Sequence, residues 1–541
     1  MKIAGICSGH DCSYGILENG VPVIHNELER FNRKKEPIDD AFKFLFDTYE
    51  DFNDIKHFSY CLNTWRNGIR NRYPDSFNTM RTIRDNNGGK FYEPGHHECH
   101  AANAFFSSNF DESLIVTIDG GGEDYDYNNG NKNMLTAFTS WYGKDNQIKL
   151  IDIVPMDSCN IGSSWNKIVR EVFGLSGTGG PLGSQAGTVM AMACMTKEEK
   201  FYEYFKTGNF NLGHLNQLIE ASSVEKYEKG CVSFDIARGW QKYTEKIIKE
   251  KINNYILDYE KLVGKTPKNL CLSGGVALNS VAVGKMYDWF PQIKNIYVDP
   301  VPYDAGIALG GPRLIWHQYL GNPRIKWEDN ASPYLGKTYN NNEIKDALNK
   351  FSSEVEFSNT TDEKVIDLLL KDDNVISVFG GGSESGRRAL GNRSILADPR
   401  SPDMKDIINE KVKHRQWFRP FAPSIIREAV GDWFERDIDS PYMTAVIKFK
   451  ESVRNKVPAV VHYDGSARLQ TVTENDNKWY YNFIKRFGEK TGVPILLNTS
   501  FNDREPIVET PEHAINCFLG TDIDYLYFYN ENILVQKRGN K

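Results

Sequence analysis

Short apolar runs separated by turns dominate the beginning of the chain. Residues 2–7 are apolar, residues 12–20 alternate between polar and apolar positions, and residues 21–28 follow a Glu18-Asn19-Gly20 turn. The same pattern returns at residues 113–122, 135–143 and 147–155, with a turn at 143–146. Two copies of a three-strand meander, each with an acid or a histidine just past its first strand, predict a duplicated α/β domain.

The remaining pattern predicts a second α/β domain. Helical periodicity dominates residues 160–260, a strand at 269–275 ends in a Gly-Gly turn, and a helix follows from residue 276. The segment 321–342 is rich in Asn, Pro and Gly and predicts a linker. From residue 343 helices and strands alternate to the end of the chain. We therefore expect two domains, 1–330 and 343–541.

Composition narrows the class of protein. A chain of 541 residues is too long for one core, and 40% hydrophobic with 25% charged residues is ordinary for a globular protein. No apolar run is long enough to span a bilayer, and the first residues lack the pattern of a signal peptide. Nine scattered cysteines without a CxxC pair indicate reduced thiols. We expect a cytoplasmic protein with no membrane partner; its oligomeric state is not determined by the sequence.

The densest chemistry lies in residues 380–424, where cations alternate with Gly, Ala, Leu and Pro. A charge run is most often a solvated face, but here Ala389, Leu390 and Phe421 require burial and draw the cations inward. Guanidinium groups pair with phosphate or carboxylate, and glycine lets backbone N–H groups approach the anion. This stretch therefore predicts an anion pocket. Its cations are Arg387, Arg388, Arg393, Arg400, Lys413, Arg415 and Arg419.

A cluster of histidines, HHECH at residues 96–100, follows Pro94-Gly95 and opens a predicted helix. Residues four apart share a helix face, so His96 and His100 point to one place. The spacing is not that of the zincin HExxH motif. Three of eleven histidines within five residues favour a metal site over isolated structural histidines. His97 is either a supporting group or purely structural.

The motifs resemble those of the O-carbamoyltransferases that modify antibiotics and nodulation factors. The resemblance is carried by SGHDCS (8–13), HHECH (96–100), TIDGGG (117–122), VPYDAGIALGG (301–311), the 380–424 stretch, HYDGSARLQTV (462–472) and TGVPILLNTSFNDREPIVETP (491–511). It covers nearly the whole chain in the family's order. It implies an actin-like, duplicated amino-terminal domain and a carboxy-terminal twisted-sheet α/β domain similar to the threonylcarbamoyl-adenylate synthase domain.

The resemblance also implies a reaction in two steps. Carbamoyl phosphate and ATP, the latter expected as its Mg²⁺ complex, give carbamoyl-adenylate in the second domain. The first domain then transfers the carbamoyl group to an acceptor hydroxyl. A closed, water-poor passage would protect the labile intermediate.

Individual residues acquire expected roles from this match. His10 and Lys35 are the expected catalytic groups, and the expected metal ligands are His96, His100, Asp119 and Asp304. Such a nitrogen and oxygen set suits iron, which we favour, or manganese or zinc. In the first domain the nucleotide is expected at Gly120, Gly121, Gly274, Gly275 and Asn279. In the second, carbamoyl phosphate and ATP are expected at Arg388, Arg393, Lys413, Arg419, Arg468, Asn498 and Ser500.

Two departures and several alternatives accompany this reading. Ala186 and Thr188 replace an acid and a lysine that are usual in the family, which puts contacts in the first domain in doubt. A tRNA threonylcarbamoylation enzyme and a non-catalytic actin-like ATP-binding scaffold are the alternative functions, although RALGNRS and LNTSFN favour carbamoyl transfer. We expect a small-molecule or nucleoside acceptor. Hydroxymethylated pyrimidines of DNA are the alternative acceptor, opposed by the net charge of −7.

Overall fold

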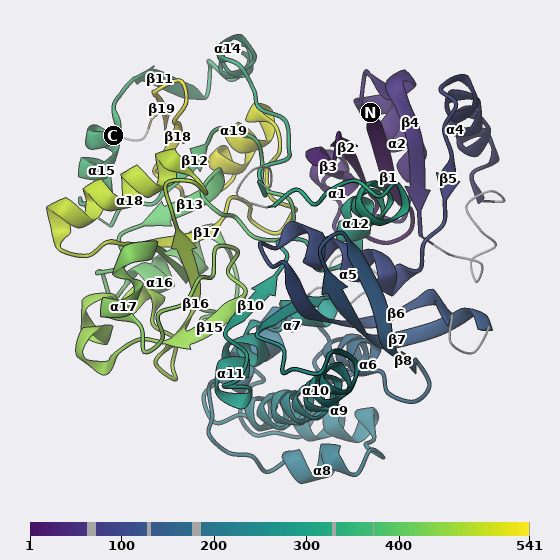
Figure 1. Ribbon diagram of the computed structural model, residues 1–541. Helices are drawn as coiled ribbons and strands as arrows, with labels where there is room; N and C mark the ends of the chain where they lie inside the picture. Colours follow the sequence, from purple (N-terminus) through teal and green to yellow (C-terminus); the bar gives the residue numbers. More distant parts are fainter. Residues whose placement is uncertain (62–71, 127–130, 176–184, 327–331, 372, 540–541) are drawn as a thin grey trace. The chain divides into compact units, whose positions relative to one another are not determined.

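The computed structural model describes residues 1–61, 72–126, 131–175, 185–326, 332–371 and 373–539 (Figure 1). These residues form a mixed α/β fold with three sheets. They divide into two compact units. The first comprises Met1–Val189, Glu199–Ala221 and Gly239–Leu335, and the second comprises Met190–Glu198, Ser222–Arg238 and Gly336–Lys541. Two short segments before residue 336 therefore belong to the second unit, and from Gly336 onward the whole chain does.

The first unit contains two sheets with the same strand order. One sheet runs β3-β2-β1-β4-β5 and the other runs β8-β7-β6-β9-β10, so each repeats an antiparallel meander followed by two parallel strands. The duplication predicted from the hydrophobic pattern is confirmed. The strands are β1 (Lys2–Cys7), β2 (Ser13–Glu18), β3 (Val21–Glu27), β4 (Ile55–Tyr60), β5 (Phe91–Tyr92), β6 (Glu112–Asp126), β7 (Asn131–Lys144), β8 (Gln147–Pro155), β9 (Asn269–Ser273) and β10 (Asn295–Val298).

Two buried helices pack tightly in this unit. Helix α5 (His96–Ser107) is buried along its whole length, and α12 (Ile307–Leu314) lies against it and against β1. Glycine permits both contacts. A Cβ on Gly310 would lie 2.0 Å from the carbonyl oxygen of Cys99, and one on Gly5 would lie 2.0 Å from that of Ala308. The two helices consequently connect the two sheets, because α12 contacts β1 of one sheet and α5 contacts β6 of the other.

The other helices before residue 335 include two, α7 and α10, whose residues are divided between the two units. The 32-residue α10 is the longest, and its residues from Gly239 onward belong to the first unit. These helices are α1 (Leu28–Asn32), α2 (Ala41–Thr48), α4 (Pro74–Asn86), α6 (Ile161–Lys167), α7 (Ala186–Ala193), α8 (Tyr202–Lys206), α9 (Leu212–Glu220), α10 (Val232–Val263) and α11 (Ser280–Trp289).

The second unit is built on a nine-stranded mixed sheet with the order β11-β19-β18-β12-β13-β17-β14-β16-β15. Apolar residues of α15 (Asp362–Leu369) and α18 (Lys478–Thr491) form a core with residues of β12 and β13. The strands are β11 (Val355–Asn359), β12 (Ile376–Phe379), β13 (Arg393–Ala397), β14 (Ala422–Ile426), β15 (Ala445–Lys448), β16 (Ser466–Val472), β17 (Ile495–Ser500), β18 (Tyr525–Phe528) and β19 (Ile533–Lys537). The remaining helices are α14 (Asn341–Lys350), α16 (Met404–Ile407), α17 (Val430–Trp433) and α19 (Pro511–Leu519).

The two units do not correspond to a single division of the chain at the predicted linker. The predicted linker, 321–342, contains the boundary between Leu335 and Gly336, although its residues 327–331 lie outside the described part of the chain. The segments Met190–Glu198 and Ser222–Arg238 belong to the second unit, which the hydrophobic pattern does not predict. Among the residues described, no helix combines the length and apolar character that crossing a membrane requires.

Candidate metal centre and anion pocket

Helix α5 supplies two imidazoles to one point of the first unit. Gly95 is its N-cap in an extended conformation, and Glu98 accepts a hydrogen bond from the Gly95 N–H at 3.2 Å. His96 and His100 lie one turn apart on the same face, and their Nε2 atoms are 3.2 Å from each other. Both side chains are buried. Two nitrogen donors thus converge, as the i, i+4 spacing predicts.

Two carboxylates, one within a strand and one in the segment after a strand, complete the group. Asp119 lies within β6, and its Oδ2 is 3.1 Å from His96 Nε2. Asp304 follows β10, and its Oδ1 is 3.5 Å from His100 Nε2. One ligand atom from each of the four residues lies within 4.8 Å of the others. The structure therefore brings together all four residues named from the sequence.

The electrostatics fit a cation at this place. Burial lowers the pKa of His96, but Asp304 and Asp119 outweigh it and hold that pKa well above its usual range. Burial lowers the pKa of His100, so this imidazole is the neutral partner of the pair. Two imidazoles and two carboxylates form a donor set that suits iron, manganese or zinc. The described residues accordingly fit a divalent metal.

A second layer holds this group in place. His97 Nδ1 lies 2.6 Å from Asp124 Oδ2, and the His97 backbone N–H donates to the other oxygen of that carboxylate at 2.7 Å. Strand β6 passes so close to the helix that a Cβ on Gly122 would lie 2.1 Å from the His96 ring. His97 thus anchors α5 to β6 through Asp124.

His10 lies beside the metal-binding candidates. Its Nδ1 is 3.2 Å from Asp11 Oδ2, and its Nε2 is 3.4 Å from Asp304 Oδ2. Burial lowers the pKa of His10, but Asp304 and Asp11 outweigh it and raise the pKa to about 9. His10 is therefore placed to hold a proton between two carboxylates. Lys35 is half-buried in the segment after α1, and its catalytic role stays a prediction.

The predicted nucleotide contacts of the first unit surround Asp119. The Gly275 N–H donates to Asp119 Oδ1 at 2.8 Å, and Gly274 adopts a φ of 84° against Ile118. The Gly120 carbonyl accepts hydrogen bonds from Asn160 and Ser163 at the start of α6. Gly121, the next residue, has a φ of 136°. These glycines bring three backbone segments to the carboxylate, and their contact with a nucleotide stays a prediction.

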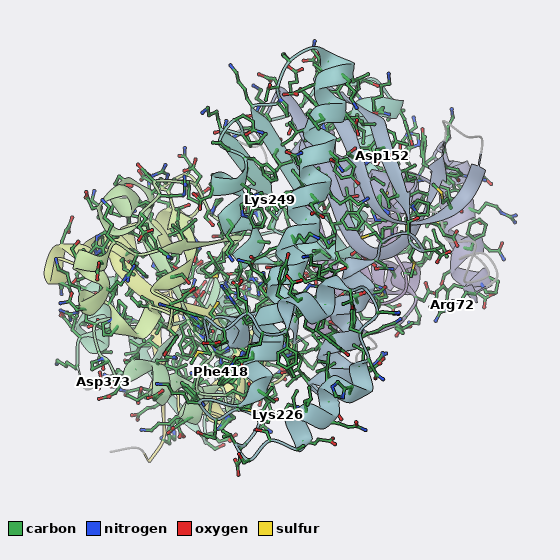
Figure 2. The ribbon with its side chains drawn as sticks, turned by 90° about the horizontal axis from the view of Figure 1, so that it is seen from below. Arg72, Asp152, Lys226, Lys249, Asp373 and Phe418 are labelled. Atoms are coloured by element: carbon green, nitrogen blue, oxygen red, sulfur yellow. The ribbon has the colours of Figure 1, made fainter. Side chains whose placement is uncertain are left out.

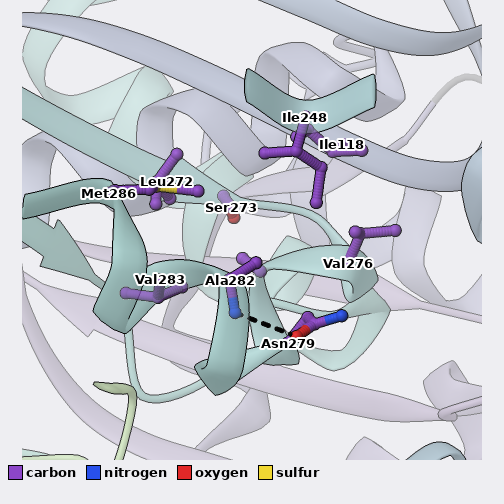
Figure 3. Close-up of a pocket in the computed structure, with 10 residues that line it drawn as sticks. Ile118, Ile248, Leu272, Ser273, Val276, Asn279, Ala282, Val283 and Met286 are labelled. Atoms are coloured by element: carbon purple, nitrogen blue, oxygen red, sulfur yellow. Dashed lines mark hydrogen bonds between the residues drawn. The ribbon is translucent and has the colours of Figure 1, made fainter. Parts of the chain in front are cut away.

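The side chain of Asn279 is held by hydrogen bonds to neighbouring residues of the first unit. It caps α11 by accepting from the Ala282 N–H at 3.1 Å, and its amide pairs with Gln241 of α10. It also lines a cavity of about 10 Å³ between α10, β9 and α11, with apolar neighbours such as Leu272 and Met286 (Figure 3). A space of that size holds about one water molecule. Asn279 therefore stabilises the helix that follows the Gly-Gly turn.

In the second unit a group of half-buried arginines lies together. Burial lowers the pKa of Arg468, and the charges of Arg388 and Arg419 lower it further. Burial and the charges of Arg419 and Arg468 likewise lower the pKa of Arg415, and burial lowers that of Arg419 to about 10. Like charges gathered where access to water is restricted repel one another, and a bound anion relieves this repulsion. These four residues, Arg388, Arg415, Arg419 and Arg468, are called the arginine cluster below.

Aromatic packing fixes one end of the arginine cluster. Phe418, which precedes Arg419, is fully buried against Phe234 and Tyr227 (Phe418 is labelled in Figure 2). The Trp417 indole N–H donates to the Tyr227 carbonyl at 3.0 Å. The segment Ser222–Arg238 thus positions the arginine-bearing loop of the second unit.

Arg393 and Lys413 make contacts mainly with the backbone. Arg393 is 0% exposed, stacks 3.6 Å from the Phe379 ring centroid and donates to the Gly380 carbonyl at 2.8 Å. Lys413 Nζ donates to the Asn502 carbonyl at 2.7 Å and contacts Ser500. Both cations order the loops around the arginine cluster, and their direct binding to substrate stays a prediction.

Asn498 lies in a polar group that sequence reasoning only partly recognised. Its amide donates to Gln470 Oε1 at 2.8 Å and to Ser424 Oγ at 3.1 Å. Glu384, which no motif had singled out, accepts from the backbone N–H groups of Leu390, Asn392 and Arg393. An acid between glycines in GGGSESG was the available signal for it. Sequence reasoning also missed Asp124, because this residue lies beyond the TIDGGG motif.

The two residues that depart from the family pattern, Ala186 and Thr188, lie in α7. Thr188 is fully buried, and its hydroxyl has no hydrogen-bond partner among the described residues. Ala186 begins the helix. Nothing in the described contacts gives either position a part in the four-residue metal group.

Comparisons with known proteins agree with this arrangement. The family model described as "Carbamoyltransferase N-terminus" matches residues 77–312, and "Carbamoyltransferase C-terminus" matches residues 368–537. An uncharacterized protein of Synechocystis sp. is 35% identical over 482 residues, covering 80% of this chain and 75% of its own. Nodulation protein NolO of Bradyrhizobium diazoefficiens is 34% identical, covering 80% and 77%. An uncharacterized protein of Methanocaldococcus jannaschii is 28% identical and covers 98% of both chains.

Proposed function

Because this chain belongs to the carbamoyltransferase family and is a carbamoyltransferase, we propose that it carries out ATP-dependent O-carbamoylation. In the first half-reaction, water and carbamoyl phosphate give carbamate and phosphate. A carbamate oxygen then attacks the α-phosphorus of ATP, which forms carbamoyl-adenylate and releases pyrophosphate. In the second, an acceptor hydroxyl attacks the carbamoyl carbon, AMP leaves with the bonding electron pair, and the hydroxyl proton passes to a base.

The arginine cluster is the observation that carries the first half-reaction. Burial and mutual repulsion lower the pKa of Arg415 and Arg468, so a polyanion bound among them would relieve an unfavourable arrangement. Bound cations of this kind stabilise charge that develops on phosphoryl oxygens. Carbamoyl phosphate and ATP are both polyanions. We assign their activation to the second unit.

The second half-reaction is assigned to the first unit. His96, His100, Asp119 and Asp304 would hold the divalent metal, which when bound supplies Lewis-acid stabilisation of phosphate charge. His10 would exchange a proton at Nε2, where Asp304 orients the ring. The buried second layer of His97 and Asp124 would keep the α5 imidazoles aligned. We propose a small-molecule hydroxyl as the acceptor.

Pyrophosphate exchange tests the first half-reaction directly. Carbamoyl phosphate should drive exchange of labelled pyrophosphate into ATP, and Arg419→Ala and Arg468→Ala should each lower the rate by roughly 100- to 1,000-fold. Arg427→Ala is the matched control, because Arg427 is paired with Asp437 and Asp439 outside the arginine cluster. Wild-type exchange in the cluster variants would refute the assignment.

Product analysis tests the second half-reaction. The protein should be incubated with ATP, carbamoyl phosphate and a panel of hydroxyl compounds that includes hydroxymethylpyrimidine nucleotides and DNA. Mass spectrometry should detect a carbamoyl group on a small molecule. Modification of DNA alone would overturn the proposed acceptor and leave the activation chemistry in place.

A further inference from the structure

A different set of metal-binding side chains lies within the second unit. Cys194 follows α7, and His462 and Asp464 lie in the turn before β16. One ligand atom from each, a sulfur, an imidazole nitrogen and a carboxylate oxygen, lies within 4.8 Å of the other two. These residues share no member with the His96 group. The sequence segments that meet here are far apart in the chain.

His462 gives an independent indication of a ligand. It is only 6% exposed, yet neither ring nitrogen has a hydrogen-bond partner among the described residues. Its Nδ1 lies 3.6 Å from Asp464 Oδ1, beyond hydrogen-bond distance. A buried polar group without a hydrogen-bond partner destabilises the fold. Coordination of one ring nitrogen would remove that cost.

The turn that carries these residues is well defined. The His462 N–H donates to the Ser466 carbonyl at 2.8 Å, and the Gly465 N–H donates to the His462 carbonyl at 2.9 Å. Asp464 Oδ1 accepts from the Ser466 N–H at 3.1 Å, which fixes the carboxylate on the turn. The imidazole and the carboxylate are thus held on one short loop, and only Cys194 comes from elsewhere.

We propose that Cys194, His462 and Asp464 bind a Zn²⁺ ion, with a fourth position open to solvent. A thiolate favours zinc over calcium or magnesium, and imidazole and carboxylate complete a common zinc set. Ligands about 2.0 to 2.3 Å from a tetrahedral zinc lie roughly 3.3 to 3.8 Å from each other. The 3.6 Å between His462 Nδ1 and Asp464 Oδ1 falls in that range. The Asp464 side chain is 37% exposed, so a water molecule has access to the fourth position.

The bound ion would support the arginine cluster. Strand β16 begins at Ser466, and Arg468 is its third residue. Zinc would join the Cys194 segment to the turn from which β16 starts and so restrain Arg468. Cys194 is a positioning residue in this proposal and touches no substrate.

Cobalt absorption tests the site. The full-length His96→Ala/His100→Ala variant, which lacks the two imidazoles of α5, should be titrated with Co²⁺ alone. We expect a thiolate-to-cobalt charge-transfer band at one equivalent, lost on addition of Zn²⁺. Adding Cys194→Ser should abolish the band, whereas Cys159→Ser, at another half-buried cysteine, should retain it.

Two further measurements separate coordination from folding. Asp464→Asn should weaken cobalt affinity by at least roughly 10-fold while circular dichroism stays that of the parent. Zn²⁺ should raise the melting temperature of the parent and leave that of the Cys194→Ser variant unchanged. Absence of the band in the parent, or its survival in Cys194→Ser, would overturn the proposal.

Discussion

The Nε2 atom of His10 lies 3.4 Å from Oδ2 of Asp304, while the other oxygen of that carboxylate faces the imidazoles of α5. One side chain therefore contacts both the group proposed to carry a proton and the group proposed to bind a metal. A change at Asp304 must affect both. Both contacts lie in the first unit, to which we assign carbamoyl transfer. Substitutions there should therefore impair transfer and leave activation of carbamoyl phosphate intact.

His96→Ala and Asp304→Asn should lose bound metal and carbamoylated product but retain pyrophosphate release. The reason is that both residues belong to the first unit, whereas activation is assigned to cations of the second. Metal analysis of the purified variants and a pyrophosphate assay provide the two measurements. His214→Ala, at an exposed histidine of α9, serves as the control. Full metal content in His96→Ala would contradict the ligand assignment.

Gly122→Ala should weaken metal binding without unfolding the protein. The added Cβ would lie 2.1 to 2.3 Å from atoms of the His96 ring, so the imidazole must move. A displaced ligand commonly costs roughly 10- to 100-fold in affinity. Equilibrium dialysis measures the change. Gly187→Ala is the matched substitution, because a Cβ there meets nothing within 4 Å, and it should leave affinity unchanged. Equal affinities in the two variants would count against the geometry described.

Alanine substitutions of Arg393 and of Arg468 should have different effects on the stability of the folded protein. Arg393→Ala removes charged hydrogen bonds to the Gly380 and Asn392 carbonyls and should destabilise the second unit by about 1.5 to 3 kcal/mol for each bond left unmade. Arg468→Ala removes a half-buried cation from among like charges and should leave the melting temperature unchanged or raise it. Thermal unfolding without substrates measures both. A large loss of stability in Arg468→Ala would mean that this arginine is structural.

The buried His317 should make the first unit sensitive to acid. Burial, aided by the charges of Arg313 and Arg324, lowers the pKa of His317 to about 3. Between the ordinary histidine pKa of about 6.5 and that value, only the unfolded chain binds the proton, so stability falls as pH falls, by about 1.4 kcal/mol per pH unit. His317→Gln should flatten the fall in melting temperature between pH 7 and roughly pH 5. The exposed-residue variant His214→Gln should keep the wild-type slope; equal slopes in all three proteins would refute the assignment.

The sequence was most informative where local spacing decides geometry. His96 and His100 converge because they are four residues apart in a helix, and the strand duplication follows from the hydrophobic pattern. Long-range contacts had no such signal. Nothing near Phe418 in the sequence predicts that Phe234, 184 positions earlier, packs against it. Lys413 likewise finds its carbonyl partners at residues 500–502. Side-chain partners chosen by tertiary packing are not encoded in local periodicity.

The aromatic contact between Phe418 and Phe234 has a practical consequence for producing part of this protein. A recombinant fragment that starts at residue 343 would lack the Ser222–Arg238 strip and expose the ring of Phe418 to solvent. Such uncovered apolar surface promotes aggregation. Fusing residues 222–238 to the fragment through a flexible spacer would restore the missing cover and should improve its yield.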